Sequence, residues 1–213
     1  MMKIHGIYNM SCRFCFIDRS KKYNEILEET KYFYITPTLG SLVDGYILII
    51  SKRHINSMTL LNEEELNEYK YLINKYRNKF KNIYKKYPII FEHGTTNLNS
   101  NFSASSVVHA HTHIINYNFY DEDNLIKNTK FKIINKLEEI SKNKNYILYI
   151  NQNNNKYISY EFPSISQYMR MCISKELNIL NKYDWHDNYF DNNINLTINK
   201  IKERGELNEE NYK

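Results

Sequence analysis

The longest amphipathic stretch of this sequence predicts a helix that has to pack on a sheet. Asn62 is a good helix cap, and the three glutamates that follow it suit the positive end of a helix dipole. Apolar side chains then recur at the spacing of one helix face until Pro88 ends the pattern: Leu66, Tyr69, Leu72, Ile73, Tyr76, Phe80, Ile83 and Tyr84. A helix with one long apolar face is expected to cover one face of a sheet.

Short apolar runs on both sides of this helix predict the strands of that sheet. Residues 32–36 and 46–50 precede the helix, and residues 89–92 and 106–116 follow it, with a polar loop at 94–103. The order strand, strand, long helix, strand, strand predicts an α+β fold with an antiparallel sheet covered by the helix.

The second half of the sequence predicts a mixture of helices and one hairpin. In chain order we expect a helix, a hairpin and two more helices, at residues 121–139, 146–150 with 157–161, 164–177 and 191–204. These segments do not repeat the first half. We therefore predict a first domain at residues 1–116 and a C-terminal extension at residues 117–213 that packs on it.

Charge and hydropathy restrict the partners and the location of the protein. The formal net charge of +5 is modest and the charged residues are interspersed, so the sequence carries no strong nucleic-acid signal, although it suits a phosphate-bearing ligand. No run approaches the roughly 20 apolar residues that cross a bilayer, and the N-terminus lacks a secretory signal pattern. We therefore expect a cytoplasmic protein without a membrane partner.

Three histidines alternate with other residues in the predicted strand at 106–116. Because successive side chains of a strand point to opposite faces, His109, His111 and His113 are expected to share one face. Imidazole can act there as nucleophile, proton donor or metal ligand. The residues alone leave a metal site and a reaction centre open, and the nearby Ser106 favours chemistry.

A pair of cysteines near the N-terminus forms a second candidate site. Cys12 and Cys15 are spaced so that both thiolates can bind one ion, which is half of a tetrahedral zinc shell. The alternative is a pair of reduced core thiols without a metal.

The sequence resembles the histidine-triad family in four segments that follow the family's order. These segments lie within residues 12–116: Cys12-Arg-Phe-Cys15-Phe-Ile17, Gly45 to His54-Ile55, Phe91-Glu92-His93-Gly94 and His109-Ala-His111-Thr-His113-Ile-Ile. The resemblance implies a histidine-triad fold and a homodimer. Farther along, Gln167, Arg170 and Trp185 lie in segments similar to longer family members. Gln167 and Arg170 could project toward substrate phosphates if their helix folds over the cleft, but we expect them on an exposed helix face.

The resemblance also implies a reaction. His111 would be the nucleophile that attacks the α-phosphorus of a dinucleoside polyphosphate, a nucleoside phosphoramidate or a related compound, giving a nucleotidyl-histidine. Ser106 would hydrogen-bond near the leaving group, and His113 would bind the phosphate or hold the tautomer of His111. Ser105 and His93 are the candidate substrate-binding residues.

The resemblance further implies that a structural zinc ion is held by Cys12, Cys15, His54 and His109. Two other functions stay open at this point. One is a metallohydrolase in which the three histidines hold a catalytic zinc with an open water position. The other is a nucleotide-binding protein without turnover.

Overall fold

The computed structural model describes residues 12–95 and 104–209, with side chains as far as residue 203, so most of the loop expected at 94–103 lies outside the described residues. The strands are β1 (Glu28–Glu29), β2 (Phe33–Pro37), β3 (Tyr46–Ser51), β4 (Ile89–Gly94), β5 (His111–Ile115), β6 (Lys132–Ile134), β7 (Tyr146–Ile150) and β8 (Lys156–Ser159). The α-helices are α1 (Glu63–Tyr84), α2 (Glu122–Asn128), α3 (Tyr168–Glu176) and α4 (Asp191–Glu209). Short 3-10 turns occupy η1 (Lys22–Asn24), η2 (Met58–Leu60), η3 (Leu137–Glu139) and η4 (Leu180–Lys182).

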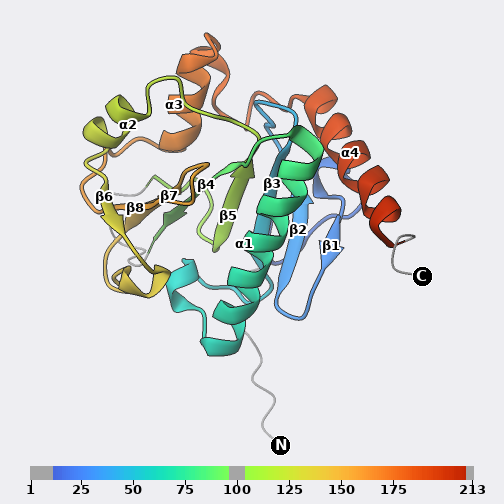
Figure 1. Ribbon diagram of the computed structural model, residues 1–213, viewed down its shortest axis with the longest axis horizontal. Coiled ribbons are helices and arrows are strands. Elements are labelled where there is room, and N and C mark those ends of the chain that lie inside the picture. The colour runs from blue at the N-terminus through green and yellow to red at the C-terminus, as the bar shows by residue number, and fades with distance from the viewer. Residues whose placement is uncertain (1–11, 96–103, 210–213) are drawn as a thin grey trace, which may run out of the picture.

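The described strands form one sheet in the order β1-β2-β3-β5-β4-β7-β8-β6, and each pair is antiparallel. Helix α1 lies across one face of this sheet (Figure 1). The predicted α+β fold with an antiparallel sheet under the long helix is therefore confirmed. Three strands that follow residue 117 extend the same sheet, because β7 pairs with β4. The boundary between a first domain and an extension stays a prediction.

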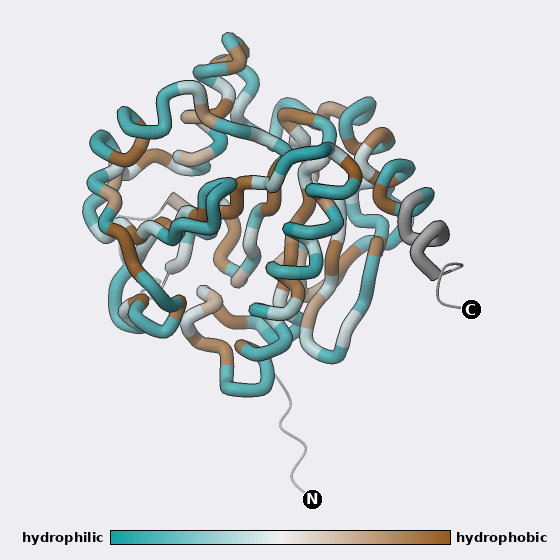
Figure 2. Tube along the Cα trace, in the orientation of Figure 1, coloured by the Kyte–Doolittle hydropathy of each residue, from teal (hydrophilic) through white to brown (hydrophobic). Residues whose placement is uncertain are grey.

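Alternating side chains give the sheet two buried faces. On β3, Ile47 and Ile49 point to the core beneath α1, whereas Tyr46, Leu48 and Ile50 point to a second core beneath α3. The central strands accordingly carry the hydrophobic colour of Figure 2, while much of each helix is hydrophilic. A strand buried on both faces reads as a continuous apolar run, which is the pattern of residues 46–50.

Helix α1 begins and ends for local reasons. The side chain of Asn62 accepts a hydrogen bond from the backbone of Glu65, and the carboxylate of Glu65 accepts one from the backbone of Asn62, which is a capping box. Arg53 pairs with Glu65 at 2.6 Å and ties this cap to the loop after β3. The helix ends at Tyr84, ahead of Pro88, because Lys85 adopts a left-handed conformation with φ 62°.

The helix predicted at 121–139 is wrong beyond Asn128. Lys130 has a left-handed φ of 53°, and the next residues turn into β6, which pairs with β8. Phe131 explains the change, because its ring packs 5.6 Å from Tyr149 and 6.3 Å from Tyr157 on the sheet. Burial of this ring outweighs the helical pattern of the flanking residues.

Two other predicted elements are shorter than expected. The helix predicted at 164–177 begins at Tyr168, because Gln167 has a left-handed φ of 60°. The strand predicted at 106–116 begins at His111, because the backbone of His109 donates to the carbonyl of Val107 in a tight turn. The hairpin is confirmed as β7 and β8, and the last helix is confirmed as α4.

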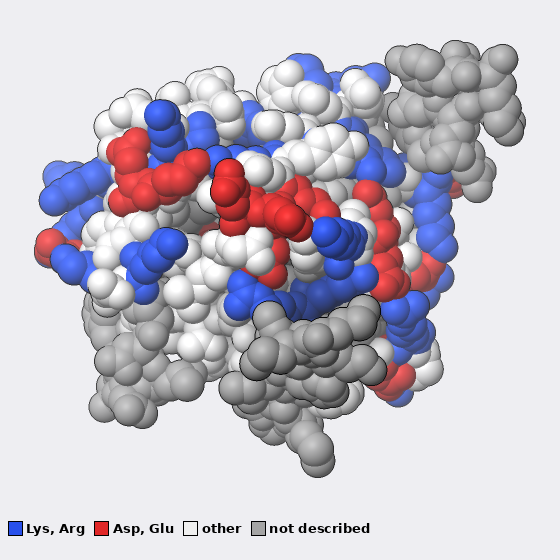
Figure 3. Space-filling view, turned by 90° about the horizontal axis from the view of Figure 1, so that it is seen from below, with Lys and Arg blue, Asp and Glu red and all other residues white. Residues whose placement is uncertain are grey.

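The hydropathy of the helices and the distribution of surface charge limit the possible partners. In the part of the chain that the structure describes, no helix has the length and apolar character needed to cross a membrane. Figure 3 shows acidic and basic side chains next to one another on the face seen from below, and neither sign covers that face alone.

We expect Asn62→Ala to lower the free energy of unfolding by about 1 kcal/mol, because the first turn of α1 loses the side-chain acceptor of its cap. Urea unfolding followed by circular dichroism measures the change. The matched control is Asn74→Ala, an exposed position within α1, where alanine should be neutral or slightly stabilising. Equal losses in both variants would contradict the role of the cap.

Candidate functional site

His111 and His113 lie on the central strand β5, on the sheet face opposite α1. They face the second core with Ile115, whereas Thr112 points to α1 and hydrogen-bonds the hydroxyl of Tyr69 at 2.7 Å. Their ring centroids are 4.9 Å apart, and both side chains are buried. The sheet therefore brings these two histidines together as predicted.

The ring of His113 is fixed on two sides. Its Nδ1 shares a hydrogen bond with the hydroxyl of Tyr46 at 2.8 Å, and its face stacks on Phe91 with centroids 4.4 Å apart and planes 18° from parallel. Burial lowers the pKa of His113 well below its usual range, so the ring is neutral near pH 7. His113 is thus held as a neutral imidazole of fixed orientation.

The orientation of His111 is set by one backbone carbonyl. Its Nδ1 lies 2.6 Å from the carbonyl oxygen of His109, and because a carbonyl can only accept, Nδ1 carries the proton. Burial lowers the pKa of His111 to about 4, which keeps the ring neutral. A neutral ring protonated at Nδ1 has its lone pair on Nε2, and that nitrogen is the basic and nucleophilic one.

His109 belongs to a different site. Its Nδ1 lies 3.3 Å from Sγ of Cys12, 3.7 Å from Sγ of Cys15 and 3.2 Å from Nδ1 of His54. One sulfur or nitrogen atom from each of these four residues lies within 4.8 Å of the others. The prediction that these residues converge is therefore met by the geometry, and the cluster could hold a metal ion.

Phe14 contacts a histidine of each group. Its ring centroid lies 5.7 Å from that of His109 and 5.1 Å from that of His111. Strand β5 starts only at His111, so His109 lies in the turn before the strand and not within it as predicted. Regular strand pairing therefore covers His111 and His113.

A narrow pocket at His111 and His113 is lined by segments from the whole chain. Arg13, Ser106 and Trp185 are among its lining residues, with His93 from β4. A broader depression of ≈ 370 Å³ adjoins it, because Arg13, Ser106, Val107 and Trp185 line both. The indole nitrogen of Trp185 donates to the hydroxyl oxygen of Ser106 at 3.0 Å.

The two candidate substrate-binding residues differ in their surroundings. His93 is buried beside His113, with ring centroids 6.2 Å apart, and its Nε2 accepts a hydrogen bond from the backbone of Met169. Burial lowers its pKa to about 3, so it is a neutral wall of the pocket. The hydroxyl of Ser105 donates instead to the carbonyl of Val107 within its own turn. The roles of both residues stay predictions.

The C-terminal segment contributes more to this pocket than the sequence indicated. Arg170 and Gln167 line it and are only 2% and 3% exposed, so the expectation of an exposed helix face is wrong. Helix α3 packs on the sheet through Met169 and Ile173, which turns Arg170 inward. Residue type alone did not reveal this, because an arginine on a short helix is usually at the surface.

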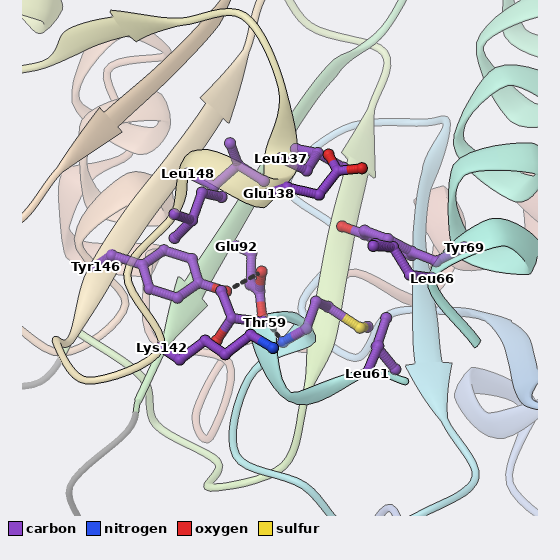
Figure 4. Close-up of a pocket in the computed structure, with 12 residues that line it drawn as sticks. Thr59, Leu61, Leu66, Tyr69, Glu92, Leu137, Glu138, Lys142, Tyr146 and Leu148 are labelled. Atoms are coloured by element: carbon purple, nitrogen blue, oxygen red, sulfur yellow. Dashed lines mark hydrogen bonds between the residues drawn. The ribbon is translucent and has the colours of Figure 1, made fainter. Parts of the chain in front are cut away.

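The opposite face of the sheet contains a separate cavity of ≈ 200 Å³. Figure 4 shows Glu92 within this cavity, hydrogen-bonded to Tyr146. The carboxylate accepts from the hydroxyl of Tyr146 and from the backbone of Met58, each at 2.7 Å. Burial raises the pKa of Glu92 to about 7 despite these two hydrogen bonds. Glu92 and His93 are consecutive residues, so they lie on opposite faces of β4.

The sequence matches one protein family over residues 2–132, and that family is described as protein similar to CwfJ C-terminal. Because the match covers more than half of the chain, the protein belongs to this family. No curated protein matches the sequence.

Solved structures similar to this chain share little sequence with it. A hypothetical histidine triad nucleotide-binding protein from Sulfolobus tokodaii is 24% identical, with a TM-score of 0.39, over 49% of this chain and 67% of that one. A Zn-bound histidine triad family protein from Mycobacterium smegmatis is 18% identical, with a TM-score of 0.41, over 53% and 79%. A Hit-like protein involved in cell-cycle regulation from Bartonella henselae is 16% identical, with a TM-score of 0.35, over 42% and 63%. This chain thus spans less than two thirds of the length of the Bartonella protein.

We expect Glu92→Gln to change how stability depends on pH. A buried acid with a pKa raised from 4.5 to about 7 stabilises the fold while it is protonated, and this contribution is lost as the pH rises through about 7. The melting temperature of the wild type should therefore fall relative to that of the variant between pH 5 and pH 8. The control is Glu138→Gln at the cavity rim, where Lys70 lowers the pKa of the carboxylate. A constant difference between wild type and Glu92→Gln across this range would contradict the assignment.

Proposed function

We propose that the protein is a nucleotidyl hydrolase or transferase in which Nε2 of His111 is the nucleophile. The single observation that carries the proposal is the 2.6 Å hydrogen bond from Nδ1 of His111 to the carbonyl of His109. It leaves the lone pair on Nε2 of a neutral ring that lines a pocket. The substrate class is a nucleoside phosphate derivative such as a dinucleoside polyphosphate or a nucleoside phosphoramidate.

The reaction takes two displacements at one phosphorus. Nε2 of His111 forms a bond to the α-phosphorus while the bond to the leaving group breaks. The leaving group keeps the electron pair, and an amine leaving group also takes up a proton from solvent. Water or another acceptor then attacks the same phosphorus, the P–N bond breaks, and the acceptor's proton passes to solvent or to the released Nε2. Dividing one displacement into two lowers each barrier. His113, held by Tyr46, would donate from Nε2 to a phosphate oxygen, and Ser106 would hydrogen-bond near the leaving group.

A catalytic zinc held by the three histidines fits the geometry less well. Phe14 packs against both His109 and His111, and Nδ1 of His109 lies near the sulfur atoms of the two cysteines. Among the described residues, the group of three or more metal-binding side chains that converge is Cys12, Cys15, His54 and His109. A protein that binds nucleotides without turnover keeps the same pocket, and the adduct experiment below distinguishes it.

A structural zinc ion fits the residues of this cluster. Nε2 of His109 lies 2.7 Å from the carbonyl oxygen of Ser51, so Nε2 carries the proton and Nδ1 faces the cysteines with a lone pair. The separations of 3.1 to 3.7 Å between sulfur and nitrogen atoms are close to the roughly 3.5 Å expected between a thiolate and an imidazole ligand of tetrahedral zinc. Four protein ligands would clamp the N-terminal segment to the sheet and supply no open position for catalysis.

Brief incubation with a dinucleoside polyphosphate or an adenosine phosphoramidate at neutral pH should add one nucleotidyl group to the protein. Intact mass measured without an acid quench detects the adduct, because the P–N bond is labile in acid. In His111→Ala we expect no adduct and a loss of turnover of at least about 10³-fold, because no covalent intermediate can form. Unchanged metal content and helical signal in the variant show that it folds. Turnover retained in His111→Ala would reject the nucleophile, and binding without turnover in the wild type would favour the non-catalytic alternative.

Purified protein should contain about one zinc ion per chain, and Cys12→Ser should lose most of it because the ion loses a thiolate ligand. Elemental analysis gives the metal-to-protein ratio, and a chelator should lower the melting temperature of the wild type. The matched control is Cys172→Ser, at a cysteine of α3 whose thiol pKa burial raises to about 11 and which lies outside the cluster. A metal-to-protein ratio near zero in the wild type would refute the zinc proposal.

A further inference from the structure

Arg170 is a buried cation with unused hydrogen-bonding capacity at the histidine pocket. Its Nη2 is fully buried and has no hydrogen-bond partner in the part of the chain that the structure describes. Arg77, which is also buried, differs in this respect, because its two terminal nitrogens donate to the carbonyls of Asn151 and Gln152. Leaving a buried charged donor unpaired is costly, so the fold keeps at Arg170 a group that an anion would satisfy.

The surroundings of Arg170 hold its guanidinium in one place. Its Nε donates to the side-chain oxygen of Gln167 and to the carbonyl of Tyr183, each at 3.1 Å. Gln167 is anchored in turn by Asp184, which accepts from its amide at 2.9 Å. Gly40 has φ +77°, and a Cβ added there would stand 2.6 Å from Nη2 of Arg170. The loop at Gly40 therefore leaves space for the guanidinium without neutralising it.

The pocket contains a second cation and no acid among its lining residues. Arg13 lies with its guanidinium 4.8 Å from the ring centroid of Trp185 and forms no ion pair with any described residue. The charge of Arg13 acts on His111, and that of Arg170 acts on His113 and His93. The two cations thus stand near different histidines of the pocket. A single phosphate charge would neutralise only one of the two arginines.

We propose that Arg170 binds a phosphate group that leaves from the attacked phosphorus, so that the site takes nucleoside compounds with a pyrophosphate linkage. This inference rests on the proposed function, and it selects one of its substrate classes. As Nε2 of His111 bonds to the α-phosphorus, the bond to the bridging oxygen breaks and its electron pair stays on the departing phosphate. The charge that grows on that phosphate lies next to the free Nη2 of Arg170, which can offer it a charge-assisted hydrogen bond.

Direct binding of inorganic pyrophosphate and of inorganic phosphate tests the subsite without any turnover. By titration calorimetry, Arg170→Gln should weaken pyrophosphate binding about ten- to a hundredfold, because a charge-assisted hydrogen bond is lost. The matched control is Lys175→Gln, which removes one positive charge from an exposed position of the same helix and should change the affinity less than about twofold. Phosphate should bind more weakly than pyrophosphate in the wild type. Equal pyrophosphate affinity in wild type and Arg170→Gln would overturn the proposal.

Two substrates with the same nucleoside test the role in the reaction. Arg170→Gln should lower kcat/KM about ten- to a hundredfold for a diadenosine polyphosphate and less than about threefold for an adenosine phosphoramidate, whose amine leaving group is neutral. Equal losses for both substrates would overturn the assignment to the leaving phosphate. Arg170→Lys keeps the charge and serves if the glutamine variant does not fold. It should bind pyrophosphate more weakly than the wild type, because an ammonium group does not reproduce the fixed donors of a guanidinium. Pyrophosphate binding that depends on Arg170, without an adduct on His111, would support the anion subsite and reject the proposed function.

Discussion

The hydrogen bond between the carbonyl of His109 and Nδ1 of His111 connects the two candidate sites of this protein. The ring of His109 faces the cysteines, whereas its backbone oxygen fixes the tautomer of His111. His109 is itself fixed by Ser51, whose carbonyl accepts from Nε2, and the end of β3 is therefore part of both sites. One residue thus positions a metal-binding cluster with its side chain and a nucleophile with its main chain.

This arrangement depends on where β5 begins. If the strand extended back to residue 106, the carbonyl of His109 would also accept from a neighbouring strand. Instead the turn at Val107 and His109 frees that carbonyl. The neighbouring Ala110 pairs across to Ser51 and Ile55, so the turn is held on both sides by backbone hydrogen bonds. The short β5 and the turn before it are therefore part of the geometry that positions His111.

The sequence predicted the elements whose patterns are local and missed those that depend on distant contacts. The cap at Asn62 and the apolar run of β3 were sufficient to predict α1 and a buried strand. The end of α2 was not predictable, because Phe131 leaves the helical pattern only when Tyr149 and Tyr157 are in place to pack against it. The histidine pair was anticipated from strand alternation, whereas the set Cys12, Cys15, His54 and His109 was anticipated only from the resemblance to the histidine-triad family. The exposure of Arg170 was predicted wrongly, because its burial depends on α3 packing against the sheet face opposite α1.

The two faces of the sheet also explain why the histidine pocket contains no acid. Glu92 directly precedes the lining residue His93, but the alternation of β4 directs it to the face of α1, where Tyr146 and Met58 satisfy it. On the same face Tyr69 hydrogen-bonds Thr112, the residue between the two histidines, and so opposes a one-residue slip of β5. A slip would turn both histidines toward α1. The polar contacts beneath α1 thus keep the imidazoles on the other face, where the described lining residues that carry charge are Arg13 and Arg170.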